Sequence, residues 1–253
     1  MKRIAFITGA TAGIGSATAE ILAQNGFHLI LSGRREERLQ ELKQKLEKVS
    51  DNPVMLLTFD IRDRKACEQA WQSLPEAWKD IDVLINNAGL AAGLAPIDTG
   101  DVDDWECMID TNIKGLLYLT RLVSPRMVER QSGHIINLSS IAGREAYASG
   151  NVYCATKHAV QALTQGMRMD LVQHGIKVSS VAPGAVETEF SMVRFKGDEA
   201  KADAVYQGYT PLKARDIAET ILFMLTRPAH VNIDDVLIMP TAQAFTRTVH
   251  RTE

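Results

Sequence analysis

The sequence predicts an α/β protein built on a doubly wound parallel sheet. Short β-branched runs alternate with longer amphipathic segments along the 253 residues. The stretches between runs usually exceed the dozen or so residues that a parallel crossover needs. No Pro/Gly/Ser-rich linker, low-complexity tract or internal repeat marks a second domain. We therefore expect a single domain, residues 1–253, with a seven-stranded parallel sheet flanked by helices.

The expected strands are short apolar runs, and longer patterned segments connect them. Their bounds are 4–8, 27–32, 54–59, 83–85, 134–138, 177–181 and 236–239. Residues 38–49 show helical patterning, with Leu39, Leu42, Leu46 and Val49 on one face. Residues 189–211 are the one long stretch without a clear strand. In an open α/β sheet such an insertion tends to cover the ligand crevice at the carboxyl ends of the strands.

Composition limits the classes of function. Hydrophobic residues make up 45% and charged residues 23%, as in globular proteins that bury a sizeable core. The formal charge of -3, without a block of Lys or Arg, argues against a nucleic-acid partner. No apolar run approaches the ~20 residues that span a bilayer, and the N-terminus enters a strand directly, which excludes a signal peptide. We expect a cytoplasmic protein without a membrane partner.

Cysteine and histidine spacing gives no support for a metal site. Cys67, Cys107 and Cys154 form no C-x-x-C pair, which fits a reducing compartment better than a disulfide framework. The six histidines are scattered without H-E-x-x-H spacing and are interpreted as ordinary surface or core residues. We expect no catalytic metal.

A glycine loop follows the first expected strand. Residues 8–15 read Thr-Gly-Ala-Thr-Ala-Gly-Ile-Gly and open a helix that runs to about residue 25, with Gly26 suited to its C-terminal cap. Glycines let the backbone approach a pyrophosphate, and the helix N-terminus offers unpaired N–H groups to the anion. The spacing G-x-x-x-G-x-G differs from the usual G-x-G-x-x-G, and the alternative interpretation is a tight turn without a ligand.

The end of the second expected strand indicates which nucleotide binds. Domains that prefer NAD carry an acidic side chain there, which bonds the ribose hydroxyl. This chain has Arg34 and Arg35 instead, and two guanidiniums can form charge-assisted bonds to a phosphate. NADP is therefore favoured over NAD. The alternative is that the arginines only begin a solvated helix over residues 34–48.

Tyr153 and Lys157 stand four residues apart at the start of an expected helix and share one face. Ser140 ends the fifth expected strand, thirteen positions before Tyr153. A phenol with a pKa of about 10 is a poor base at neutral pH. A fixed ammonium within about 4 to 6 Å can lower that pKa, and Lys157 is placed to supply one. The bare Y-x-x-x-K pattern is weak because surface helices show it by chance.

Together these motifs resemble the short-chain dehydrogenase/reductase family along the whole chain. They appear in the family's order as 8–15, Asn86-Asn87-Ala88-Gly89, Asn112, Ser140, Tyr153 with Lys157, and Pro183-Gly184. The resemblance implies a Rossmann-like fold, an NADP cofactor (NADP+ or NADPH) and a homotetramer.

The resemblance also implies four catalytic roles. Tyr153 would be the acid/base that takes the hydroxyl proton while hydride leaves the same carbon for the nicotinamide. Ser140 would hydrogen-bond the substrate oxygen. Lys157 would lower the tyrosine pKa and hold the nicotinamide ribose. Asn112 would hold, through the main chain of a kinked helix, a water that passes the proton to solvent. Ser139 is the neighbour most easily confused with Ser140, and alternation along the strand lets only one of them face the site.

A larger set of cofactor-binding residues is carried over from the family's motifs. The set consists of Gly9, Thr11, Ala12, Gly13, Ile14, Gly15, Arg34, Arg35, Asp60, Ile61, Asn87, Ala88, Gly89, Tyr153, Lys157, Pro183, Gly184, Val186 and Thr188. Asp60 and Ile61 would lie against the adenine, and residues 183–188 would face the nicotinamide and phosphates.

Three segments, 191–198, 228–233 and 34–42, resemble more narrowly the NADP-dependent 3-hydroxy acid dehydrogenases, which also oxidise serine and allo-threonine. The implied reaction converts a small 3-hydroxy acid, such as 3-hydroxypropionate, to its 3-oxo acid or the reverse. A carboxylate substrate needs a cation. Arg194 is the first candidate, Arg144 the second, and Lys196 a further one; the alternative for each is a surface charge or a subunit contact.

Two other functions stay open at this point. One is a ketone or 3-oxoacyl reductase of the same family, and the other is a non-catalytic NADP-binding sensor. The intact Ser140, Tyr153 and Lys157 argue against a sensor, which needs no proton relay. Contact surfaces for the implied tetramer are expected at residues 113–123 and 163–171. The sequence leaves open whether residues 245–253 reach a neighbouring subunit or are disordered.

Overall fold

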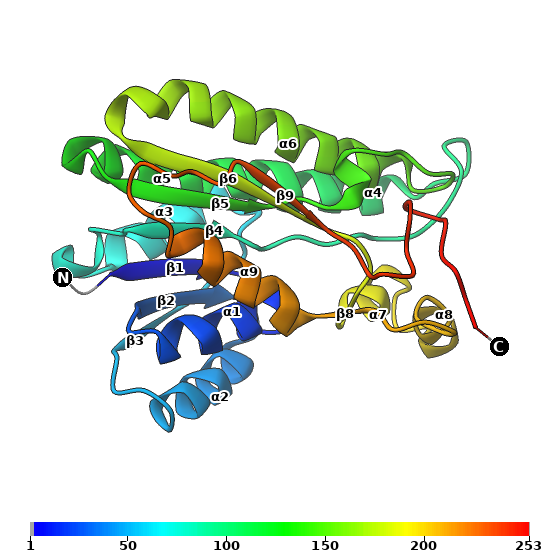
Figure 1. Ribbon diagram of the computed structural model, residues 1–253, viewed down its shortest axis with the longest axis horizontal. Coiled ribbons are helices and arrows are strands. Elements are labelled where there is room, and N and C mark those ends of the chain that lie inside the picture. The colour runs from blue at the N-terminus through cyan, green and yellow to red at the C-terminus, as the bar shows by residue number, and fades with distance from the viewer. Residues whose placement is uncertain (1–2, 253) are drawn as a thin grey trace.

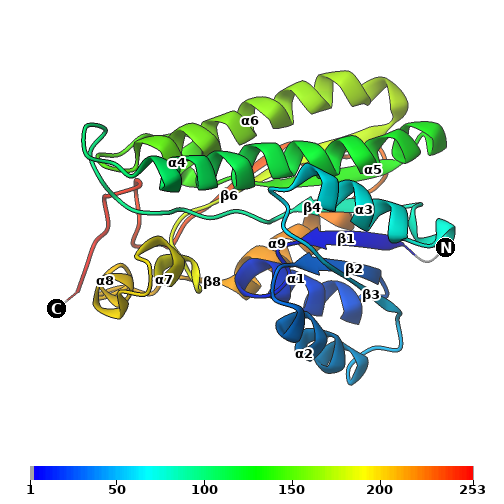
Figure 2. The same ribbon diagram turned by 180° about the vertical axis from the view of Figure 1, so that it is seen from behind.

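The structure, a computed structural model, describes residues 3–252 and has a central parallel sheet covered by helices on both faces (Figures 1 and 2). The strand order is β3-β2-β1-β4-β5-β6-β9, and every neighbouring pair is parallel. The strands are β1 (Ile4–Thr8), β2 (His28–Gly33), β3 (Val54–Thr58), β4 (Val83–Asn86), β5 (Gly133–Leu138), β6 (Ile176–Pro183) and β9 (Asp235–Ile238). The predicted doubly wound, Rossmann-like sheet of seven strands is confirmed. The order reverses between β1 and β4, where such sheets bind ligands.

Two apolar layers hold the helices against the sheet. The first joins β1 and β2 to α1 (Gly13–Gln24), α2 (Glu36–Glu47) and α9 (Ala214–Leu225). The second joins the opposite face to α3 (Arg64–Ser73), α5 (Leu116–Arg130) and α6 (Asn151–Leu171). Most apolar side chains of these helices are buried in the two layers. Within residues 3–252 no helix combines the length and hydropathy needed to cross a membrane.

Helix α2 begins and ends inside the predicted range of 34–48. Leu39, Leu42 and Leu46 are buried, as their spacing predicts. Val49 was expected on the same face but is 51% exposed, because the helix ends before it and the face no longer continues. Arg35 is extended and precedes the helix.

A widened turn interrupts the long helix that crosses the second layer. Helix α4 (Val102–Ile109) leads into a π-helical turn (Asp110–Gly115), which continues as α5. Asn112 lies in the middle of this turn and is buried. The irregular helix expected at Asn112 is therefore present, and π turns of this kind often mark functional sites.

The insertion at residues 189–211 forms a lid at the carboxyl end of the sheet (Figure 1). It contains α7 (Phe190–Arg194) and α8 (Glu199–Ala204). A small parallel sheet of β7 (Val186–Glu187) and β8 (Leu212–Lys213) closes its base. These two strands were not predicted, because two residues carry no periodic pattern.

The described part of the C-terminal tail folds back onto its own chain. Thr252 N donates to Gly208 O at 2.7 Å beside the lid, and Thr246 N donates to the Glu145 carboxylate at 3.1 Å. Residues 245–252 thus contact the loop that follows Ser140 and the end of the lid. The prediction for this tail extends to Glu253, which lies outside the described residues, as do residues 1–2.

A buried histidine makes the fold sensitive to acid. His134 on β5 is 4% exposed and pairs with the Ser179 hydroxyl at 2.9 Å. Burial is the main cause that lowers its pKa to about 3. The unfolded chain therefore binds this proton near pH 6.5 and the folded chain does not, so stability is lost as pH falls from about 6.5 towards 3. We expect His134→Gln to remove about 1.4 kcal/mol per pH unit from the pH dependence of unfolding in that range, measured by urea titrations of both proteins. Parallel curves for the two proteins would contradict this.

Candidate active site

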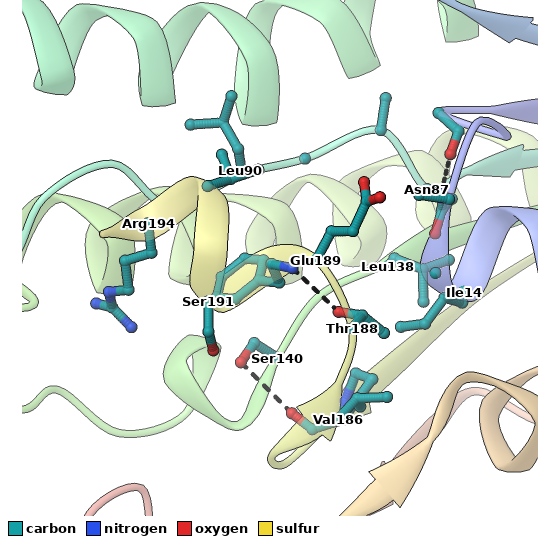
Figure 3. A pocket seen from close by; sticks show the side chains of 18 of the residues that line it. Ile14, Asn87, Leu90, Leu138, Ser140, Val186, Thr188, Glu189, Ser191 and Arg194 are labelled. Atoms are coloured by element: carbon teal, nitrogen blue, oxygen red, sulfur yellow. Dashed lines mark hydrogen bonds between the residues drawn. The ribbon is translucent and has the colours of Figure 1, made fainter. Parts of the chain in front are cut away.

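A cavity of about 490 Å³ lies at the carboxyl ends of the strands, between the sheet and the lid. It extends from the loop after β1 to the C-terminal tail, and Figure 3 shows Ile14 and Asn87 at one side and Arg194 at the other. All the predicted catalytic, cofactor and substrate residues line it except Gly15, Asn112, Arg144 and Lys196. The fold thus brings residues from Gly9 to Arg194 to one cavity.

The glycine loop after β1 passes close to the neighbouring backbone. Gly9 has φ +65, and a Cβ there would lie 2.9 Å from Ala88 Cα. Gly13 has φ +55, a region in which side chains are rarely tolerated. Gly15 lies beneath the loop, where a Cβ would come within 2.4 Å of Gly9 O. Gly15 therefore permits the packing of the loop but does not line the cavity.

Hydrogen bonds hold the residues that follow β4 against this loop. The Thr8 hydroxyl accepts hydrogen bonds from Asn87 N and Ala88 N, at 3.0 and 2.9 Å. The Asn87 amide donates to Thr8 O at 2.8 Å. Helix α1 starts at Gly13 behind Ala12, which has no capping oxygen, and its first turn carries no acidic residue. Its N-terminal N–H groups suit an anion, as a pyrophosphate requires.

Arginines and a threonine surround the end of β2. Arg35 donates to the Thr11 hydroxyl at 2.9 Å and pairs with Glu189 at 2.9 Å. Arg34 Nη1 lies 3.8 Å from Oδ2 of Asp60, a residue that follows β3. Burial alone would raise the pKa of Asp60, but hydrogen bonds and charge from Arg62 lower it overall. This donor set fits a cofactor that carries a ribose phosphate.

Tyr153 is buried at the start of α6, where its ring lies 5.6 Å from that of Phe190. Burial raises the pKa of its phenol, and a hydrogen bond with Ser140 opposes that effect in part. Ser140 Oγ accepts from Ala142 N at 3.1 Å and donates to Pro183 O at 3.4 Å. Ser139 Oγ instead donates to Lys157 O at 3.3 Å. Ser140 is thus the serine that meets the tyrosine hydroxyl.

Lys157 lies one turn further along α6, with Nζ 5.9 Å from the centroid of the Tyr153 ring. Nζ donates to Leu138 O at 2.9 Å, and burial lowers the pKa of this ammonium to about 8. The expectation that Lys157 lowers the pKa of Tyr153 does not hold for the protein alone, because desolvation of the phenol is the larger effect.

Asn112 lies just outside the cavity lining. Its side chain is used within the protein: Oδ1 accepts from Leu90 N at 2.9 Å, and Nδ2 donates to Leu90 O and Thr156 Oγ1. A Cβ on Gly89 would lie 3.2 Å from Asn112 Oδ1 and 3.3 Å from Lys157 Nζ. The π-helical turn therefore lies directly behind Lys157.

The end of the cavity under the lid is cationic. Arg194 donates to the Tyr147 hydroxyl at 2.5 Å, and its guanidinium carbon lies 5.4 Å from the ring centroids of both Tyr147 and Tyr153. Its Nε is buried and finds no hydrogen-bond partner among residues 3–252. Arg247 from the tail lies over the same Tyr147 ring at 4.8 Å and also lines the cavity.

Two of the predicted substrate cations are used elsewhere. Arg144 forms an ion pair with Asp235 at 2.6 Å and does not line the cavity, so the structure does not support it as a substrate contact. Lys196 pairs with Asp104 at 2.9 Å and Asp101 at 3.2 Å, which ties the lid to the loop before α4. None of these three acidic partners could be predicted from the sequence, because each lies more than 90 positions from its cation.

Among the cavity residues that the sequence did not single out are three polar or charged ones, Tyr147, Glu189 and Arg247. Tyr147 follows Ser140 in a loop without a pattern, and Arg247 depends on how the tail returns. Within residues 3–252, no three His, Cys, Asp or Glu side chains gather in a group that could hold a metal ion.

Comparisons with known proteins agree with this architecture. The family model described as short chain dehydrogenase matches residues 3–199. The chain is 50% identical over 250 residues to the NADP-dependent 3-hydroxy acid dehydrogenase YdfG of Salmonella typhi, covering 98% of this chain and 99% of that one. It is 47% identical to sulfoacetaldehyde reductase 2 of Chromohalobacter salexigens, covering 97% of each chain. The closed form of serine dehydrogenase complexed with NADP+ superposes with a TM-score of 0.92 at 48% identity, covering 98% of this chain and 100% of that one.

Proposed function

The chain belongs to the short-chain dehydrogenase family, and we propose that it transfers hydride between NADP(H) and a small 3-hydroxy acid, with Tyr153 as the acid/base. The observation that carries this proposal is the position of Arg194. The Arg194 guanidinium carbon lies 5.4 Å from the centroid of the Tyr153 ring in the same cavity, and its buried Nε has no hydrogen-bond partner in the described part of the chain, residues 3–252. An acid group held by this cation puts the hydroxyl of a three- or four-carbon substrate within reach of Tyr153.

The cofactor would be held at the other end of the cavity. Arg34, Arg35 and Thr11 would bind the ribose phosphate, and the α1 N-terminus would face the pyrophosphate. The remaining members of the predicted cofactor set would line the cleft, with Asp60 and Ile61 beside the adenine. When bound, NADP+ supplies the hydride acceptor and a positive charge beside Tyr153.

The protein's own residues would then handle the proton. Ser140 would donate a hydrogen bond to the substrate oxygen, and Tyr153 would take the proton from the substrate hydroxyl. With its pKa near 8, Lys157 can gain or lose a proton close to neutral pH and so pass it on. Asn112 would keep the widened turn behind Lys157 in place, where a water could continue the relay.

The acid group of the substrate would meet more than one donor. Arg194 is the proposed first contact; it donates a hydrogen bond to the Tyr147 hydroxyl, and Arg247 lies over the same Tyr147 ring. The resemblance to a sulfoacetaldehyde reductase gives a second candidate substrate, a small sulfonate aldehyde, because sulfonate and carboxylate both suit guanidinium donors. A ketone or 3-oxoacyl reductase would have less use for unpaired cations at this position.

A substrate panel tests the proposed function. Serine, allo-threonine, 3-hydroxypropionate, sulfoacetaldehyde, an acyl thioester and a bulky ketone are each assayed with NADP(H) and with NAD(H). We expect turnover of the small acids with NADP(H). Turnover confined to the thioester or the bulky ketone would contradict the substrate, and absence of all turnover with retained NADP binding would favour a sensor.

Arg194→Ala tests the proposed substrate cation. We expect the KM for 3-hydroxypropionate to rise at least tenfold while kcat changes less, because the acid group loses a charge-assisted contact. Arg144→Ala is the matched control, since it removes the same charge from a residue paired outside the cavity, and it should leave KM unchanged. An unchanged KM in Arg194→Ala, or a rise in the control, would reject this assignment.

Further properties are proposed from the family resemblance. The chain would act as a single domain with residues 189–211 as the substrate cover, would form a homotetramer, and would work in the cytoplasm. The exposed Leu117 on α5 and Met169 on α6 belong to the two expected contact surfaces. A monomer by light scattering would remove the tetramer.

A further inference from the structure

The lid is tied to the cofactor end of the cavity by one carboxylate. Glu189 directly precedes α7, and each of its oxygens meets a different arginine of the segment around α2. Oε2 pairs with Arg35 Nη1 at 2.9 Å, and Oε1 pairs with Arg38 Nη1. Glu189 also lines the cavity and projects from the lid between Arg194 and the cofactor loop (Figure 3).

This carboxylate uses donors that a phosphate also needs. Two oxygens on two guanidiniums reproduce the contacts that two phosphate oxygens would make. The remaining donors of Arg35, Nε and Nη2, both point to Thr11 Oγ1, at 3.3 and 2.9 Å. A ribose phosphate that binds Arg35 therefore either displaces Glu189 from Nη1 or lies beside a like charge.

The exchange is energetically feasible because all three side chains are about half exposed, at 45%, 45% and 41% for Arg35, Arg38 and Glu189. Exposed ion pairs of this kind contribute little to stability, so another anion can readily replace the carboxylate. A dianionic phosphate is the stronger partner for a guanidinium. NAD(H), which lacks this phosphate, would leave the Glu189 contacts in place.

We propose that Glu189 is a cofactor-specificity residue, which competes with the 2′-phosphate of NADP(H) for Arg35 and Arg38. This inference rests on the proposed function. Binding of the phosphate frees the first residue of the lid, five positions before Arg194, so the cofactor end and the substrate end of the cavity are coupled through α7. The lid keeps its other ties, from Arg194 O to Gly93 N and from Lys196 to Asp104.

Isothermal titration calorimetry with NADP+ and NAD+ tests the competition. Glu189→Gln keeps the shape and removes the charge, so we expect the Kd for NADP+ to fall three- to tenfold and the Kd for NAD+ to change less than twofold. Glu219→Gln is the matched control, because it removes the same charge from an exposed side chain that pairs with an arginine, Arg215, and does not line the cavity. It should leave both constants unchanged.

Arg35→Gln shows whether the effect passes through this arginine. We expect weaker NADP+ binding, and a smaller gain than in the wild-type background when Glu189→Gln is added to it, because only the competition for Arg38 remains. Hydrogen exchange supplies a second readout: amides of α7 should exchange faster with adenosine 2′-monophosphate bound than with adenosine 5′-monophosphate bound. Unchanged or weaker NADP+ binding in Glu189→Gln, or an equal gain in the Arg35→Gln background, would overturn the inference. A wild-type protein that binds NAD+ as tightly as NADP+ would instead overturn the proposed cofactor, and the inference with it.

Discussion

Tyr153→Phe lowers kcat by about 10²- to 10⁴-fold, because the ring stays in place while the group that accepts and returns the proton is gone. The phenylalanine ring keeps its contacts with Phe190 and Arg194, so the fold and the cavity shape should persist. NADPH binding, followed by its fluorescence, should change less than threefold. Steady-state assays with 3-hydroxypropionate and NADP+ measure the loss.

Tyr147→Phe is the matched control for that change. It removes a hydroxyl from the same cavity, but one that accepts a hydrogen bond from Arg194. We expect its effect mainly on the KM of acid substrates, with most of kcat kept. If Tyr153→Phe retained more than a tenth of the wild-type kcat, or if Tyr147→Phe lost as much as Tyr153→Phe, the assignment of the acid/base would be wrong.

Lys157→Met is expected to abolish most activity and yet to stabilise the fold. Burial lowers the pKa of Lys157 from 10.5 to about 8, which corresponds to a cost of about 3 kcal/mol for keeping it charged in the folded protein. Methionine removes this cost, and the lost hydrogen bond to Leu138 O offsets about 1 kcal/mol of the gain. We expect unfolding at pH 7 to require about 2 kcal/mol more, with kcat reduced at least 100-fold.

The pH dependence of this gain has a definite sign. Below pH 8 Lys157 is charged in the folded and unfolded states, so the stability of the wild-type protein is reduced by the full cost of burying the charge. Between pH 8 and 10.5 only the unfolded chain holds the proton, so wild-type stability rises with pH relative to the variant. Urea titrations at pH 7 and pH 10 measure the difference. A variant that is less stable than wild type at pH 7, or whose advantage grows at pH 10, would contradict the burial argument.

Much of the fold could be predicted because its signals are local. Each strand of the main sheet contains a short run rich in apolar residues, and the glycine loop with its helix follows from residues 8–26. The strand order and the β7–β8 pair could not be predicted, because they depend on contacts between distant segments. Val49 shows the same limit, since the apolar pattern continued past the residue where the helix ends.

The candidate site also has residues that the sequence could predict and properties that only the fold shows. The sequence identified Ser140, Tyr153 and Lys157 because several other motifs accompany them in the expected order. In the structure all three line one cavity. The sequence favoured Arg194 over Arg144 as the substrate cation without a contact to support that order. Only the fold shows that Asp235 pairs with Arg144 while Arg194 Nε has no partner among the described residues. The pKa of Tyr153 was misjudged because sequence gives the nearby charge but not the depth of burial.

The central claim is that this cavity oxidises a small hydroxy acid held by its acid group beside Tyr153. The most direct measurement compares kcat/KM for 3-hydroxypropionate with that for 3-hydroxypropionamide, following NADPH formation in the wild-type protein. The amide keeps the size and the reacting hydroxyl but has no charge for Arg194. We predict that the acid is preferred by at least 50-fold, and equal values for the acid and the amide would contradict the account.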